Sequence, residues 1–147
     1  MIIQYLNSTV SAQSILIADD SEVVRQLLTD ACATIGCEMD VASDGDEDLR
    51  LFTEKKHSFV LTDYILPSIS GVDLVIGVRR IAPAVPCLIF TGHPDDRVRR
   101  FTEETDNCWF MVKPLKLIQL VHFIIEALNE AQELEGARTM DSESSDA

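Results

Sequence analysis

At 147 residues, the chain is long enough for one domain whose folding buries about two-thirds of its unfolded surface. Its 25 acidic and 12 basic residues give a net charge of −13 at pH 7, which disfavours direct binding to nucleic acid or to an anionic membrane and favours metal cations and basic partners. No apolar run approaches the roughly 20 residues of a membrane span and no signal-peptide pattern opens the chain, so we expect a cytoplasmic protein.

Short apolar runs, each suited to a strand, recur along the chain. They are expected at residues 15–18, 37–42, 58–62, 87–91 and 108–112. Four of these runs are continuously apolar, as in a parallel sheet that is covered on both faces, whereas 37–42 alternates as an edge strand does. The four cysteines form no CxxC pair and are expected to be buried thiols.

Segments of helical period separate and follow these runs. They are expected at residues 24–35, 44–56, 72–81, 95–106 and 115–135. In 44–56, acids in the first turn and lysines in the last match the helix dipole, and Ser70 with Asp73 forms a capping box before 72–81.

This alternation predicts an α/β fold with an open parallel sheet and right-handed crossovers. The domain is expected to span 14–135, after an N-terminal extension at 1–13. Residues 136–147 have no periodicity and are expected to form a disordered acidic tail.

Four of the five expected strands end in polar residues, namely Asp19-Asp20, Asp63, Thr91 and Lys113. In open α/β sheets, ligands bind outside the carboxyl ends of the strands. Two carboxylates about 4 Å apart repel by about 4 kcal/mol at an effective dielectric constant of 20, and a bound Mg²⁺ would relieve this repulsion. The alternative for the first pair is that Asp20 or Ser21 simply caps the helix that follows.

A metal beside a carboxylate, an ammonium and a hydroxyl is a set suited to phosphoryl transfer. Asp63 is the candidate nucleophile, since carboxylates can form aspartyl phosphates. Mg²⁺, Lys113 and the Thr91 hydroxyl would neutralise or bind the phosphoryl oxygens. Taken alone, Lys113 is equally well explained as a surface lysine.

The motifs "IADDSEVVRQLL", "VLTDYILPSISGVDLV", "LIFTG" and "FMVKP" resemble, in this order, those of the receiver domains of bacterial two-component response regulators. The resemblance covers about residues 15–130. Pro67 and Gly71 lie four and eight residues after Asp63, as they do in that family. This resemblance implies a flavodoxin-like, doubly wound (βα)5 sandwich with a five-stranded parallel sheet in the order 2-1-3-4-5.

The resemblance also implies roles for individual residues at the metal site. Asp63 matches the phospho-acceptor, Asp20 the direct Mg²⁺ ligand and Asp19 its water-mediated neighbour. Ile65 would give its backbone carbonyl to the metal. Since the Ile65 side chain neither orients nor activates water, the phosphoryl group is expected to be long-lived, and His93 is expected to be a loop histidine rather than a base.

Thr91 and Lys113 match the switch hydroxyl and the phosphate-contacting lysine. Phe110 falls where the family carries its switch aromatic, without the hydroxyl of a tyrosine. Its alternative role is that of a core aromatic. The switch would change a surface formed by residues 95–106, 108–112 and 115–135, which we call the output face.

The helix expected at 115–135 carries a stripe that should face the sheet, formed by Leu117, Leu120, Val121, Ile124 and Leu128. Ile118 and Ile125 lie off this stripe beside His122, which indicates a partner or homodimer face unless the buried stripe is simply wide. Arg97, Arg99 and Arg100 on the preceding helix would either pair with acids across that face or be solvated.

The sequence therefore predicts a stand-alone receiver, not otherwise an enzyme, that takes a phosphoryl group from a sensor histidine kinase or a histidine phosphotransfer protein. The alternative is an interaction module that is not phosphorylated. "ADDSE" lacks the spacing of a haloacid-dehalogenase-type phosphatase, and the acidic "DDSEVV" would repel the phosphate of a flavin.

Overall fold

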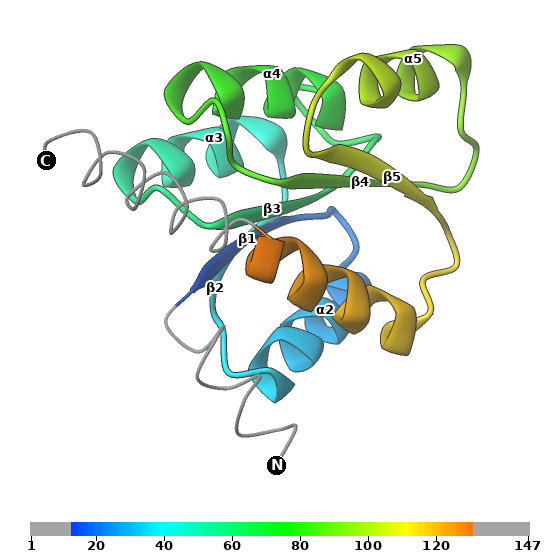
Figure 1. Ribbon diagram of the computed structural model, residues 1–147. Helices are drawn as coiled ribbons and strands as arrows, with labels where there is room; N and C mark the ends of the chain where they lie inside the picture. The colour runs from blue at the N-terminus through cyan, green and yellow to red at the C-terminus, as the bar shows by residue number, and fades with distance from the viewer. Residues whose placement is uncertain (1–12, 131–147) are drawn as a thin grey trace, which may run out of the picture.

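The computed structural model describes residues 13–130 as alternating strands and helices (Figure 1). The predicted tail at 136–147 and the predicted extension, apart from residue 13, lie outside this range. The elements are β1 (Ser14–Ala18), α2 (Glu22–Thr34), β2 (Glu38–Ala42), α3 (Gly45–Glu54), β3 (Phe59–Asp63), α4 (Gly71–Ile81), β4 (Cys87–Thr91), α5 (Asp96–Glu104) and β5 (Cys108–Val112). A last described helix covers residues 117–130.

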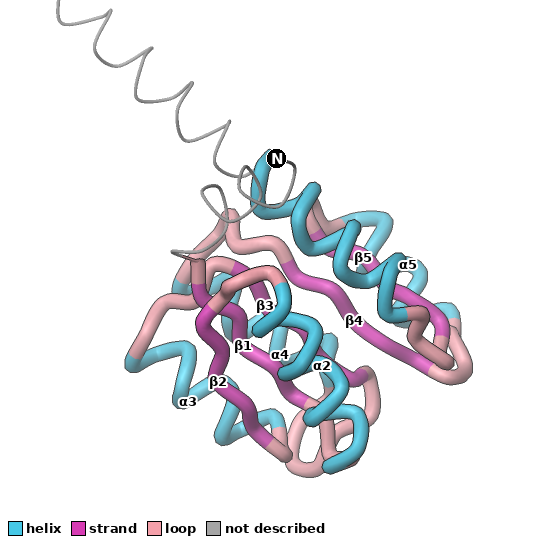
Figure 2. Tube along the Cα trace, turned by 90° about the horizontal axis from the view of Figure 1, so that it is seen from below, coloured by secondary structure: helices cyan, strands magenta, loops and turns pink. Residues whose placement is uncertain are grey.

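The five strands form one parallel sheet in the order β2-β1-β3-β4-β5. Figure 2 shows the helices on both sides of this sheet. Helix α2 and the last described helix cover one face, over a cluster that includes Ile15, Phe59 and Leu88. Helices α3, α4 and α5 cover the other, over Leu16, Val60 and Ile89. The predicted doubly wound fold and strand order are confirmed.

Side chains cap the helices largely where the sequence predicts. Ser70 accepts a hydrogen bond from the backbone N–H of Asp73, and Asp95 accepts one from Val98 at the start of α5. The prediction that lysines occupy the last turn of the 44–56 helix is wrong. Helix α3 ends at Glu54, and Lys55 instead reaches across to the Glu38 carboxylate at 3.2 Å.

The last described helix begins at residue 117 rather than 115. Leu120, Ile124 and Leu128 are buried as predicted, but Leu117 is 40% exposed, so its assignment to the stripe that faces the sheet is wrong. Ile118 is 77% exposed. Ile125 differs from it, because it is partly buried and packs against the core.

The loop between β3 and α4 folds back onto the tip of β3. The backbone N–H of Gly71 donates to the carbonyl of Tyr64 at 2.8 Å, and the N–H of Tyr64 donates to Phe90 at 2.7 Å. A Cβ at position 71 would overlap the carbonyl oxygen of Asp63. The glycine is therefore required for the close approach that fixes this strand tip.

All four cysteines are buried, as expected. Burial raises the pKa of Cys32 and of Cys87 to about 12, so these thiols are poor nucleophiles at neutral pH. Within residues 13–130, no helix combines the length and the apolar character that crossing a membrane requires.

Candidate functional site

The two acids that follow β1 lie in different environments. Asp19 is fully buried, and its carboxylate accepts a hydrogen bond from the backbone N–H of Ser21 at 2.9 Å. The Arg25 guanidinium donates to the Asp19 carbonyl at 2.8 Å, which holds the backbone at this point. Asp20 is exposed. Ser21 caps α2 by accepting a hydrogen bond from the backbone N–H of Val24, so of the two predicted candidates, Asp20 and Ser21, the serine is the cap.

The end of β3 brings a third carboxylate to the same place. Asp63 is the last residue of that strand and is 9% exposed. One carboxylate oxygen from each of Asp19, Asp20 and Asp63 lies within 4.8 Å of the other two. These three predicted residues therefore converge at one edge of the sheet.

Lys113 follows β5 and joins this group. Its ammonium donates to Asp63 at 3.1 Å and to Asp19 at 3.3 Å. Its backbone N–H donates to the carbonyl of Thr91 at 2.8 Å, and its peptide bond to Pro114 is cis. The Lys113 ammonium thus joins the tips of β1 and β3, and the backbone of the same residue ties the tip of β5 to that of β4.

The charges at this site act on one another. Burial and the negative charge of Asp19 raise the pKa of Asp63 above its ordinary value, although the hydrogen bond from Lys113 opposes this shift. Burial pulls the pKa of Lys113 down, but the hydrogen bond to Asp63 and the charge of Asp19 more than offset this, so it is raised. One ammonium therefore does not fully compensate the carboxylates.

The donor set fits a divalent cation. Three carboxylates, one of them exposed to water, offer only hard oxygen ligands, and such ligands favour Mg²⁺ over softer metals. The three carboxylates also outnumber the single Lys113 ammonium that contacts them, which leaves negative charge for a cation to neutralise.

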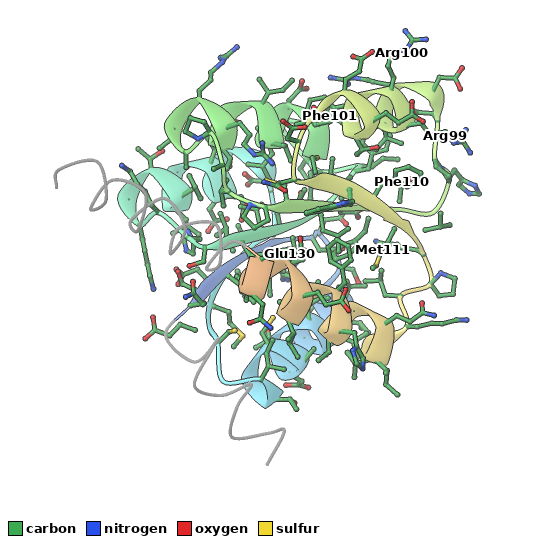
Figure 3. All side chains as sticks on the ribbon, viewed as in Figure 1. Arg99, Arg100, Phe101, Phe110, Met111 and Glu130 are labelled. Carbon is green, nitrogen blue, oxygen red and sulfur yellow. The ribbon has the colours of Figure 1, made fainter. Side chains whose placement is uncertain are left out.

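The two predicted switch residues lie beside the acidic site rather than within it. Thr91 is buried, and its hydroxyl accepts a hydrogen bond from the backbone N–H of His93 at 3.1 Å. Phe110 pairs with Ile89 in the β4–β5 ladder and packs, partly buried, on the side of the sheet that α5 covers (Figure 3). The side chains of Ile65 and His93 are exposed next to the strand tips.

One connection at this edge has no counterpart in the sequence predictions. The hydroxyl of Tyr64, the residue after Asp63, donates to the carboxylate of Asp95 at 2.9 and 3.1 Å. The sequence places Asp95 at the start of a helix, but no periodicity or spacing relates it to a residue 31 positions earlier.

Comparison with known proteins gives a consistent result. The family model described as the response regulator receiver domain matches residues 15–125. The transcriptional regulatory protein PrrA of Mycobacterium leprae is 30% identical over 118 residues, which are 79% of this chain and 50% of that protein. The DNA-binding transcriptional regulator NtrC of Azospirillum brasilense is 27% identical over 119 residues, 81% of this chain and 25% of that protein. The chain thus spans a quarter to a half of these curated relatives.

Solved structures show the same architecture. A response regulator receiver domain protein from Clostridium thermocellum has a TM-score of 0.75 at 30% identity, covering 84% of this chain and 99% of that one. Chemotaxis protein CheY4 of Vibrio cholerae has a TM-score of 0.72 at 22% identity, covering 78% and 98%, a likeness of fold.

Proposed function

The chain belongs to the response regulator receiver domain family, and from this premise we propose that Asp63 accepts a phosphoryl group from a sensor histidine kinase or a histidine phosphotransfer protein. Receiver domains are signalling domains of two-component systems, and phosphorylation and Mg²⁺ binding are general features of the family. The single observation that carries the proposal is the contact of Lys113 with both Asp19 and Asp63 beside the acidic group.

In the proposed reaction, a carboxylate oxygen of Asp63 attacks phosphorus. A new O–P bond forms, the P–N bond to the donor imidazole breaks, and the imidazole leaves with the electron pair and takes up a proton. Asp63 is held for this attack by the rigid tip of β3 and by the loop anchored at Gly71. The ammonium of Lys113 lies where it can follow the carboxylate and bind a phosphoryl oxygen.

Mg²⁺, when bound, would neutralise charge on the phosphoryl oxygens. The residues proposed to hold it are Asp20 and Asp63 directly, Asp19 through water, and the backbone carbonyl of Ile65. Asp19 already uses one oxygen to bind the Ser21 N–H and the other to bind Lys113, which suits an indirect role.

The proposed signal runs from Thr91 and Phe110 to the output face, now defined as α5, β5 and the last described helix. Arg99 and Arg100 extend outward from α5 (Figure 3). Ile118 is exposed on the helix that follows β5. Arg97 does not belong with the free arginines, because it pairs with Asp73 at 2.8 Å. The exposed Ile118 and the two outward-pointing arginines of the output face favour an acidic protein target or a second copy of the chain.

We also propose that the chain acts in the cytoplasm, through binding to a protein target. The curated relatives carry further sequence beyond the matched region.

The test of the proposed function is phosphorylation in vitro. Incubation with Mg²⁺ and a small-molecule phosphodonor should add one phosphoryl group in an acid-stable, base-labile linkage. Asp63→Asn should abolish the adduct, and a chelator should prevent it, because the acidic group then lacks its cation. Intact-mass spectrometry measures both.

The exposed Asp30 on α2 offers the matched control, since Asp30→Asn should leave phosphorylation unchanged. An adduct that persists in Asp63→Asn would refute the acceptor assignment. No adduct on the native chain with several donors would favour the alternative, an interaction module that is not phosphorylated.

The phosphoryl group on Asp63 should be long-lived. The side chain of Ile65 is 76% exposed beside the acceptor and can neither orient nor activate water. Ile65→Asn should shorten the lifetime several-fold by supplying a group that positions water. Loss of the adduct is followed by mass spectrometry after the donor is removed, and a native half-life of only seconds would contradict the prediction.

A further inference from the structure

We propose that the hydrogen bond between Tyr64 and Asp95 is a latch that restrains the start of α5, so that phosphorylation of Asp63 must break it to move the output face. This inference rests on the proposed function of Asp63. It adds a positioning residue, Tyr64, which contacts neither the metal site nor the phosphoryl group.

The main chain and the ring of Tyr64 are both held in place. Its backbone N–H is bound to Phe90 and its carbonyl to Gly71, so its main chain is tied to β4 and to the start of α4. Its ring is 8% exposed and belongs to the core cluster beneath α4 and α5. The hydroxyl therefore projects from a rigid support.

Asp95 connects this support to α5. One of its carboxylate oxygens accepts from the Tyr64 hydroxyl and also from the backbone N–H of Val98, at 2.9 Å for the second bond. Asp95 is the N-cap of α5, so the hydroxyl holds the residue that stabilises the first turn of that helix. Hydrogen bonds to a charged acceptor are stronger than those between neutral groups.

The latch lies at the end of the short loop that joins the switch residue Thr91 to α5. Only Gly92, His93 and Pro94 separate Thr91 from Asp95. The Thr91 hydroxyl accepts from the His93 N–H, so this short loop is tied to the switch residue at one end and to Tyr64 at the other. If Thr91 turned to donate to a phosphoryl oxygen, it would pull on a loop that Tyr64 holds in place.

The first arm of the test needs no phosphoryl group. In the full chain, Tyr64→Phe removes only the hydroxyl and keeps the packed ring. The backbone N–H of Val98 should then exchange with solvent about tenfold faster, because its acceptor loses a partner. Arg100→Gln is the matched control. It changes an exposed arginine of the same helix, away from Tyr64 and Asp95, and should change exchange less than threefold.

The second arm measures coupling to the site. With Mg²⁺, beryllofluoride serves as a phosphoryl analogue, and Tyr64→Phe should bind it several-fold more tightly than the native chain, since no bond must be broken. In an Asp95→Asn background, which keeps the cap but removes the charge, Tyr64→Phe should have a smaller effect on both measurements.

The outcomes separate the two proposals. Unchanged exchange in Tyr64→Phe would refute the hydrogen bond, and faster exchange with unchanged or weaker beryllofluoride binding would refute its role as a latch. If the native chain fails to bind beryllofluoride at all, the function proposed for Asp63 fails and the latch falls with it.

Discussion

Asp48→Asn should remove most of the loss of stability, several kcal/mol in the native chain, that accompanies a rise from about pH 5 to about pH 9. Asp48 is fully buried in the first turns of α3, and neither of its carboxylate oxygens has a hydrogen-bond partner. Burial, with the charges of Glu47 and Asp44, raises its pKa from 3.8 to about 8.

The sign follows from the two states. The unfolded chain releases this proton near its ordinary pKa, while the folded chain keeps it to about pH 8, so the folded state binds more protons between these values. Stability contributed by the neutral form is therefore present at low pH and lost as pH rises. At about 1.4 kcal/mol for each pH unit, the full loss is at most about 6 kcal/mol.

Denaturant unfolding, followed by the fluorescence of Trp109, measures this effect. Trp109 is the one tryptophan of the chain. Its ring packs edge-on against Phe123, with 5.0 Å between the ring centroids, so its emission reports whether the protein is folded. Asp46→Asn removes an exposed carboxylate two residues away and should leave the native pH dependence in place. Parallel pH profiles for Asp48→Asn and the native chain would show that the buried carboxylate is not the cause.

Lys113→Ala should lower the free energy of unfolding by about 2 kcal/mol near neutral pH, and added Mg²⁺ should restore much of this loss. Breaking a buried ion pair costs about 3–5 kcal/mol because the remaining charge is uncompensated. We expect less here, since the Lys113 side chain is 27% exposed and Asp63 can take up a proton. A divalent cation bound by the same carboxylates replaces the missing positive charge.

The same variant tests how the phosphoryl group is sensed. Lys113→Ala should still be phosphorylated in part but should lose the structural response of the output face, because no ammonium follows the new charge. Exchange of the α5 amides, with and without phosphodonor, measures the response. Lys116→Ala, at an exposed position three residues later, is the control. A full response in phosphorylated Lys113→Ala would contradict the role of this lysine.

The strand tips could be predicted because their signal is local. An apolar run that ends in a charged residue fixes both a strand and the chemistry at its end, and parallel pairing then brings Asp19, Asp63 and Lys113 to one edge. Sequence patterns are weaker near helix ends. They therefore predict neither that Leu117 is exposed rather than facing the sheet nor that α3 ends at Glu54.

Other features depend on tertiary contacts that no periodicity encodes. In the sequence, Asp48 is one of several first-turn acids suited to a helix dipole, and only the packing of α3 against the sheet and α4 makes it a buried carboxylate. Likewise, the sequence places Tyr64 directly after a strand and Asp95 at the start of a helix, with nothing to relate the two. Their hydrogen bond depends on how α5 lies across the sheet.

The edge strand β2 limits how copies of this chain can associate. Among the described residues its one strand neighbour is β1, and it carries Glu38 and Asp40, with the Lys55 ammonium 3.2 Å from the first carboxylate and 3.9 Å from the second. A second sheet aligned along this margin would have to strip water from these ions and set like charges opposite one another. Continuous intermolecular β-pairing along β2 is therefore disfavoured, which protects this margin of the sheet from fibrillar growth.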